Sequence, residues 1–232
     1  GRSAKQITLM LEQCGIPLSA VKAVFVTHEH TDHVQGLRVF ASRNHIKVYA
    51  SAGTLRALDG MGCLNKVEAD IVGLSGMECA GMFIKPFHTS HDCAEGYGYR
   101  VTTADGRTAV FSTDLGFISP EVQEGLSGCD LAVLESNHDV GMLRNGAYPY
   151  PQRILSDRGH LSNEVCAQEL PILAKNGTTR FVLAHLSREN NTPDLAYQTA
   201  VCSLTMAGLT KGLDYELLVA PRENTEHRTI LF

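Results

Sequence analysis

A short string of histidines with one aspartate is the part of this sequence best suited to do chemistry. Residues 28–33 read His-Glu-His-Thr-Asp-His and place His28, His30, Asp32 and His33 within one turn, directly after the apolar run Val-Phe-Val-Thr. Hydrogen bonds can satisfy one buried imidazole, but four clustered groups of this kind would repel one another or stay unsatisfied without a cation. A His-rich surface loop is the plain alternative, yet such a loop need not follow a strand and precede a helix. The string therefore predicts a metal site.

Three more residues of the ligand type follow apolar runs further along the chain. His91 comes after the run 82–87, Asp114 ends Phe-Ser-Thr-Asp at 111–114, and His185 ends Val-Leu-Ala-His at 182–185. A lone histidine at the end of a strand is more often a hydrogen-bonded structural residue. His88 competes with His91 for the ligand role, and we expect His88 to support the site without binding the metal.

These motifs resemble those of the metallo-β-lactamase superfamily, whose signature is His-x-His-x-Asp-His. The strings Glu-Ser-Asn-His-Asp at 135–139 and Gly-His-Leu-Ser-Asn at 159–163 are similar to its YycJ (WalJ/VicX-type) branch and to ribonuclease Z-like phosphodiesterases. The resemblance runs along the whole chain and implies an α/β (α+β) fold, the four-layer αββα metallo-β-lactamase sandwich. Family members begin with an extra strand pair, so we expect these N-terminal strands to be missing from the chain.

The resemblance also implies two divalent metal ions, which we expect to be zinc or manganese, with iron possible. Two neighbouring cations repel each other strongly, so an anionic group is needed between them. The implied ligands fall into three groups: His28, His30 and His91 on the first ion, Asp32, His33 and His185 on the second, and Asp114 between them.

The activity that the resemblance implies is that of a cytoplasmic, metal-dependent nuclease, a 5′-to-3′ exonuclease on double-stranded DNA that uses a metal-bridging hydroxide as its nucleophile. An alkoxide is a poor leaving group, so a phosphodiesterase benefits from a positioned acid. His160, oriented by Glu135, would protonate the leaving oxygen, and with Asp32 these residues form the expected catalytic set. Asn137 and His138 are the expected substrate contacts, although His138 could equally support the site from behind. The plain alternative for His160 is a helix-entry residue bonded to backbone.

Two other functions compete with a nuclease. A hydrolase of a small ester, lactone, thioester or cyclic phosphodiester is favoured slightly by the net charge of −5, because proteins that grip long nucleic acid are usually basic. The metal ions would add local positive charge that this sum omits. A non-catalytic nucleic-acid-binding relative is the other possibility, but degenerate members lose ligands and here every expected ligand is present.

Alternating elements must position these residues. Helices are predicted at 3–14, 34–43, from Ser51, from 119, at 163–175 and at 192–207, and strands at 22–27, 46–50, 66–74, 82–87, 130–134, 180–184, 214–219 and 227–231. A hairpin at 97–113 turns at Asp105-Gly106, a favoured two-residue turn. Residues 141–161, rich in Gly, Pro and Tyr, are predicted to form a long loop, which in a compact domain is usually functional or mobile.

Size and composition indicate an ordinary globular protein. The 232 residues, 44% of them hydrophobic, suit one domain spanning 1–232. No apolar stretch approaches the ~20 residues of a membrane span, so we expect no membrane partner. The seven cysteines are dispersed, which is typical of reduced thiols in the cytoplasm. We expect a nucleic acid substrate, with DNA favoured, and the sequence leaves the oligomeric state open.

Overall fold

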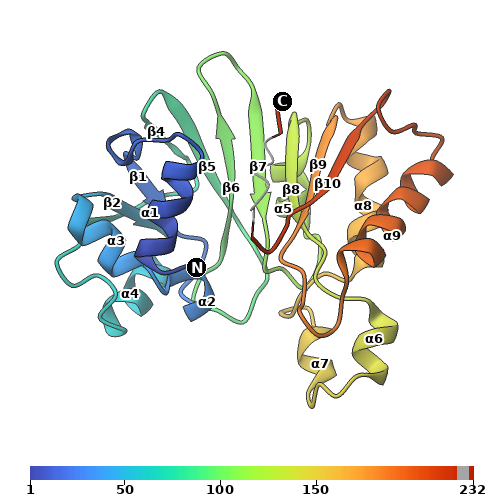
Figure 1. Ribbon diagram of the computed structural model, residues 1–232, viewed down its shortest axis with the longest axis horizontal. Coiled ribbons are helices and arrows are strands. Elements are labelled where there is room, and N and C mark those ends of the chain that lie inside the picture. The colour runs from blue at the N-terminus through green and yellow to red at the C-terminus, as the bar shows by residue number, and fades with distance from the viewer. Residues whose placement is uncertain (224–229) are drawn as a thin grey trace. The chain divides into compact units, whose positions relative to one another are not determined.

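Parallel strands whose ends carry the candidate residues form the framework of the chain (Figure 1). The computed structural model describes residues 1–223 and 230–232. They divide into two units, the first comprising Gly1–Pro86 with Cys93–Tyr97 and the second Phe87–Asp92 with Gly98–Phe232. The single domain inferred from chain length stays a prediction. The strand predicted at 227–231 falls largely outside the described residues.

The first unit carries a parallel three-stranded sheet in the order β1-β2-β3. Its core is a cluster of buried aliphatic side chains that includes Val26, Leu37, Val48 and Leu58. The elements of this unit in chain order are α1 (Ala4–Gln13), a 3-10 turn (Leu18–Ala20), β1 (Ala23–Phe25), α2 (Thr31–Val34), α3 (Leu37–Asn44), β2 (Lys47–Ala50), α4 (Ala52–Gly60), β3 (Ala69–Ile71), β4 (Met77–Cys79) and most of β5 (Met82–His88).

Side-chain caps explain where α1 and α4 of this unit begin. Ser3 and Gln6 form a reciprocal capping box at α1, and the Ser51 hydroxyl accepts from the Thr54 N–H at α4. Such caps satisfy backbone N–H groups that have no partner within the helix. The Ser51 hydroxyl also donates to the Glu95 carbonyl at 2.7 Å, which ties the segment 93–97 to the start of α4.

The second unit is built on the strand order β10-β9-β8-β7-β6, in which only the β6–β7 pair is antiparallel. Helices α5, α8 and α9 supply apolar side chains to its core, among them Leu126, Leu170 and Leu204. The elements in chain order are β6 (Tyr97–Thr102), β7 (Thr108–Ser112), α5 (Pro120–Leu126), β8 (Leu131–Glu135), α6 (Val140–Asn145), α7 (Pro151–Ile154), α8 (Asn163–Lys175), β9 (Arg180–Ala184), α9 (Pro193–Met206) and β10 (Glu216–Val219).

The register of β7, β8 and β9 brings their carboxyl ends to one edge of the sheet. Ser112 pairs with Leu134, and Glu135 pairs with Ala184. Asp114 follows β7 by two residues and His185 follows β9 by one. Ligand sites of α/β proteins gather at such carboxyl edges, so the topology alone brings three candidate residues together.

The loop predicted at 141–161 is only partly irregular, because it contains most of α6 and all of α7, two short helices that lie together at the lower edge of Figure 1. The short strand β4 was not predicted, whereas the hairpin of β6 and β7 forms where expected. No helix within the described residues is long and apolar enough to cross a membrane.

Candidate metal centre

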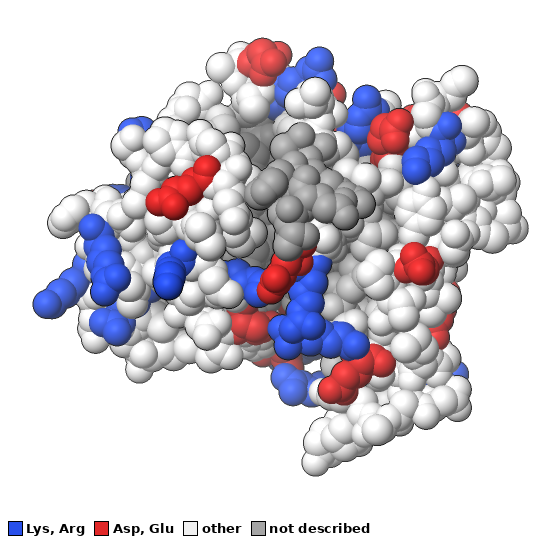
Figure 2. All heavy atoms as spheres, in the orientation of Figure 1, with Lys and Arg blue, Asp and Glu red and all other residues white. Residues whose placement is uncertain are grey.

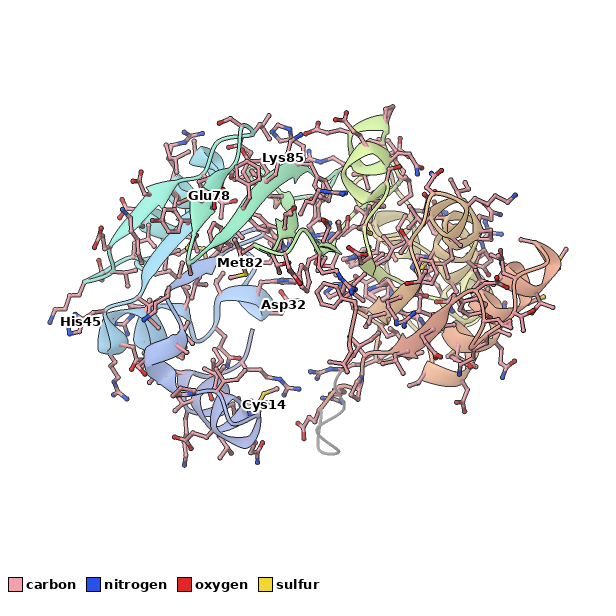
Figure 3. The ribbon with its side chains drawn as sticks, turned by 90° about the horizontal axis from the view of Figure 1, so that it is seen from above. Cys14, Asp32, His45, Glu78, Met82 and Lys85 are labelled. Carbon is pink, nitrogen blue, oxygen red and sulfur yellow. The ribbon has the colours of Figure 1, made fainter. Side chains whose placement is uncertain are left out.

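The histidine string of the first unit spans the turn after β1 and the start of α2. His28 is buried, and its ring centroid lies 4.6 Å from that of His30 and 4.2 Å from that of His33. The Thr27 hydroxyl lies 3.1 Å from Nδ1 of His28. Asp32, labelled in Figure 3, stands on α2 with 71% of its side chain exposed, and its carboxylate is 3.7 Å from Nε2 of His33. The turn therefore gathers the three imidazoles as the sequence predicts.

Glu29, which separates two of these histidines in the sequence, binds the backbone of a neighbouring segment. Its carboxylate accepts a hydrogen bond from the Ala94 N–H at 2.7 Å, and the Thr27 carbonyl accepts from the Tyr97 N–H at 2.9 Å. Both bonds tie the turn to the segment 93–97 of the same unit, so Glu29 helps to fix the backbone that carries the histidines.

In the second unit, one buried carboxylate organises a second cluster of histidines. Oε1 of Glu135 lies 2.8 Å from Nδ1 of His160 and 2.8 Å from Nδ1 of His185. Oε2 accepts from the backbone N–H groups of Leu115 and Leu161, both at 3.1 Å. A fully buried carboxylate is costly unless all its lone pairs find donors, and this one has four.

These donors keep Glu135 ionised. Burial by itself raises the pKa of Glu135, but the hydrogen bonds from His160 and His185 outweigh it and lower the pKa to about 2. Because an ionised carboxylate can only accept, Nδ1 of each ring must carry the proton in these bonds. That leaves Nε2 of His185 as the atom available to a metal.

His91 is oriented in the same way by a backbone carbonyl. Its Nδ1 donates to the Gly159 carbonyl at 3.0 Å, which again directs the role of a ligand to Nε2. Nε2 of His91 lies 3.8 Å from Oδ1 of Asp114, and Nε2 of His185 lies 3.4 Å from the same oxygen. Burial lowers the pKa of His91 and so favours the neutral ring that metals bind.

This arrangement suits a cation. Nε2 of His91, Nε2 of His185 and an oxygen of the buried Asp114 carboxylate converge, and a divalent cation binds ligand atoms of these kinds. Ligand atoms of Asp114, Glu135, His160 and His185 also lie within 4.8 Å of one another. The donor set of this unit therefore fits a divalent metal that takes nitrogen and oxygen ligands, with Glu135 as the residue that orients the rings.

Backbone strain occurs at two of these residues. Asp114 and His185 both have a φ of 58°, in the left-handed region that residues other than glycine seldom adopt. Each such residue costs on the order of 1 kcal/mol or more. Both follow a strand at the same sheet edge, so the strained turns aim their side chains at a common point.

His160 differs from the other rings of the cluster. Burial lowers its pKa, but the hydrogen bond and the charge of Glu135 outweigh burial, so that the pKa of His160 is raised. Its side chain remains 17% exposed. A protonated imidazole that reaches solvent and is held by a buried carboxylate can donate a proton to a bound group.

Gly159 makes this geometry possible. A Cβ at Gly159 would lie 2.0 Å from the Ile154 carbonyl oxygen, so only glycine fits between α7 and His160. The backbone donors Leu115 and Leu161 and the Gly159 acceptor were not predicted from the sequence. The string Gly-His-Leu-Ser-Asn at 159–163 is the signal in the sequence that points to this segment.

The two expected substrate contacts are both buried. The Asn137 amide donates to the His185 carbonyl at 2.9 Å, and the Asn137 carbonyl accepts from the Ser187 N–H at 2.7 Å. Both bonds hold the turn that carries His185. His138 is 1% exposed, and burial lowers its pKa. These positions favour the supporting role for His138, and direct contact of either residue with substrate stays a prediction.

His88 contacts α5. Its backbone N–H donates to a Glu121 carboxylate oxygen at 2.8 Å, and its Nδ1 lies 3.0 Å from the same oxygen. In contrast, His91 is buried within the cluster around Asp114. The structure therefore favours His91 over His88 as the ligand of this segment.

Comparison with known proteins agrees with these motifs. A family model described as the beta-lactamase superfamily domain matches residues 6–186. The exodeoxyribonuclease WalJ of Streptococcus pneumoniae is 35% identical over 223 residues, which cover 94% of this chain and 82% of that protein. The exodeoxyribonuclease YycJ of Bacillus anthracis is 34% identical over 221 residues, which cover 94% and 83%.

Solved structures share the fold. The metallo-β-lactamase fold protein YhfI from Bacillus subtilis superimposes with a TM-score of 0.67 at 16% identity, over 92% of this chain and 80% of that one. Human tRNase Z, short form, gives a TM-score of 0.54 at 16% identity, over 78% of each chain. The prediction of an α/β metallo-β-lactamase fold is confirmed. The chain is a hydrolase that belongs to the β-lactamase superfamily and, within it, to the family of the WalJ and YycJ proteins.

Proposed function

We propose that this chain hydrolyses phosphodiester bonds of DNA as a metal-dependent exonuclease. The names of its relatives WalJ and YycJ support a nucleic acid substrate. The single observation that carries the proposal is the Glu135 carboxylate, which holds both His160 and His185 at 2.8 Å. Glu135 thereby places a proton donor, His160, beside a ring, that of His185, whose Nε2 is suited to bind a metal. Cleavage of a phosphodiester with an alkoxide leaving group benefits from both groups.

We propose the ligand set that the family pattern implies, on the strength of that pattern and of the donor chemistry of each unit. The proposed ligands of two divalent ions, zinc or manganese, are His28, His30, Asp32, His33, His91, Asp114 and His185. When bound, the ions supply the nucleophile by lowering the pKa of a coordinated water, and they offset negative charge that develops on the phosphate.

The remaining steps belong to side chains of the second unit. His160, whose pKa is raised by its hydrogen bond with Glu135 and the charge of that carboxylate, would donate a proton to the departing oxygen. Glu135 stays anionic throughout, because four donors surround it, and so it fixes the orientation of both rings. Asp32, in the first unit, would complete the proposed catalytic set as a ligand of the second ion. Asn137 and His138 stay proposed substrate contacts.

We propose that the enzyme digests double-stranded DNA in the 5′-to-3′ direction, as the family resemblance implies. We also propose that it acts in the cytoplasm. Among the described residues, which include all seven cysteines, no disulfide forms, and this suits a reducing compartment. Fluorescently labelled blunt duplex DNA tests the activity and its polarity together. Protein loaded with zinc or manganese should release nucleotides progressively from the 5′ ends. Protein with bound metal that leaves the duplex intact would refute the proposal.

The acid role of His160 has its own test. In His160→Gln the cleavage of DNA should slow by about 10²–10⁴-fold. Hydrolysis of bis(p-nitrophenyl) phosphate, whose leaving group needs little protonation, should slow much less. Equal losses on the two substrates would show that His160 does not act as the acid.

A small-molecule hydrolase remains the competing function. Basic and acidic side chains are interspersed on the face that Figure 2 shows, and the net charge is −5. The overall charge of the protein therefore does not favour DNA over a small substrate. A panel of lactones, thioesters and cyclic phosphodiesters beside duplex DNA separates the two. Higher kcat/KM on a panel member than on DNA would favour the competing function.

A further inference from the structure

The segment between β8 and α8 presents an aromatic side chain to solvent. Tyr150, which precedes α7, is 69% exposed, more than any other tyrosine or phenylalanine among the described residues. Exposed single apolar residues are common and by themselves need no explanation. Tyr150 becomes informative through its neighbours, which connect it to the cluster around His91.

Arg153 lies one turn beyond Tyr150 and is anchored beside His91. The Arg153 N–H donates to the Tyr150 carbonyl at 3.0 Å. Its guanidinium donates from Nε at 2.8 Å and from Nη2 at 2.6 Å to one oxygen of Asp92, the residue after His91. The Arg153 side chain nevertheless stays 63% exposed. Tyr148 also lies beside this guanidinium. An arginine that keeps much of its side chain in solvent can still bind an anion.

Arg158 makes a second connection to the same turn. Its Nε and Nη2 donate to the His91 carbonyl at 3.1 and 3.0 Å. The Ser90 hydroxyl donates to the Asp157 carbonyl at 2.6 Å, so the two backbones are fastened at several points. Arg158 is exposed, and it precedes the proposed acid His160 by two residues. Tyr150, Arg153 and Arg158 together form what we call the arginine–tyrosine rim.

We propose that the arginine–tyrosine rim binds an unpaired stretch of the DNA strand that the enzyme cuts, an inference that rests on the proposed function. Arg153 and Arg158 would contact phosphates, since planar guanidinium groups match phosphate oxygens well. Tyr150 would stack on a base, as exposed aromatic side chains do in proteins that hold single strands. The base must be unpaired, because the face of a base is hidden within a duplex stack.

Equilibrium binding tests the rim without any catalysis. The probe is a fluorescein-labelled oligothymidine of about 12 nucleotides, titrated in EDTA against the full chain and followed by fluorescence anisotropy. Tyr150→Ala should raise Kd about five- to 150-fold, and Tyr150→Phe, which keeps the ring, should bind close to wild type. Arg153→Gln should reduce the slope of log Kd against log salt by about 0.7. Leu213→Ala, at a position 75% exposed, is the matched surface control and should change nothing.

The outcomes separate the rim from the proposed function. If the rim variants bind like wild type and the enzyme cuts DNA, the proposed binding role of the rim is refuted and the proposed exonuclease function is unaffected. Binding that depends on Tyr150 and Arg153, in a protein that cuts no DNA with metal bound, would support the rim and refute the function. Equal weakening by Tyr150→Ala and Tyr150→Phe, or a wild type that binds no oligothymidine, would also overturn the inference. Circular dichroism of each variant checks that it folds.

Discussion

Replacing Glu135 by glutamine perturbs the candidate site at the group that orients it. The carboxylate faces two imidazole N–H donors on one oxygen and two backbone N–H donors on the other. An amide has one oxygen and one NH2 group, so it can satisfy only one of these pairs. If its NH2 faced the rings, His185 would have to move its proton to Nε2, the atom proposed to bind a metal.

The expected cost is large for a substitution that changes so little volume. Removing one charged partner of a buried ion pair costs about 3–5 kcal/mol. We therefore expect the free energy of unfolding of metal-free Glu135→Gln to fall by about 3–5 kcal/mol, and its metal affinity to weaken about 10–100-fold.

The acid side of the stability profile should change as well. The pKa of Glu135 in the folded protein, about 2, lies below its ordinary value of 4.5. Glu135 therefore stabilises the fold above its ordinary pKa, and this contribution is lost as the pH falls from 4.5 toward 2. The glutamine variant lacks the group, so its stability should depend less on pH in that window.

Urea denaturation in EDTA measures both effects, with Glu169→Gln as the matched control. Glu169 is also a buried glutamate of the second unit, but its carboxylate accepts a hydrogen bond from the Gln123 amide at 2.6 Å and contacts no histidine of the cluster in the part of the chain that the structure describes, and burial raises its pKa. A neutral glutamine should be tolerated there with a loss below about 1 kcal/mol. Equal free energies of unfolding for the Glu135 and Glu169 variants would refute the reasoning.

Four further substitutions, in three tests, probe the site. Asp114→Ala should remove at least one metal ion per chain by elemental analysis, because it deletes the proposed anionic bridge; two ions still bound would contradict the ligand assignment. His91→Gln should lower the metal content whereas His88→Gln should not, and equal metal contents would show that the choice between these histidines is wrong. Gly159→Ala should lower the free energy of unfolding by about 1–3 kcal/mol, since the new Cβ would meet the Ile154 carbonyl oxygen at 2.0 Å; an unchanged urea midpoint would exclude that clash.

Much of the fold could be predicted because the residues that cap its helices can be recognised in the sequence. Ser51, Ser119, Ser162 and Thr192 each accept a backbone hydrogen bond at a helix start that the sequence predicts. The helices α6 and α7 were not predicted, since they are short and depend on tertiary contacts such as that of Arg153 with Asp92. A three-residue strand like β4 is likewise too short to leave a periodic signal.

The candidate site was predictable in its residue types but not in its connections. The family resemblance implies that Glu135 orients His160, whereas its equal bond to His185 depends on the register of β8 and β9. Backbone donors such as the Leu115 N–H have no sequence signature, because almost every residue carries the same group. The strained φ of Asp114 is hidden for a similar reason, since no glycine marks it. The assignment of ligands to metals stays a prediction.

Anomalous diffraction from crystals grown with zinc or manganese is the most direct measurement of the proposed metal centre. We expect two peaks for each chain, one bonded to Nε2 of His91, the other to Nε2 of His185, and both in contact with the carboxylate of Asp114. Crystals saturated with metal that show no peak at these atoms, or a single peak remote from Asp114, would contradict the account.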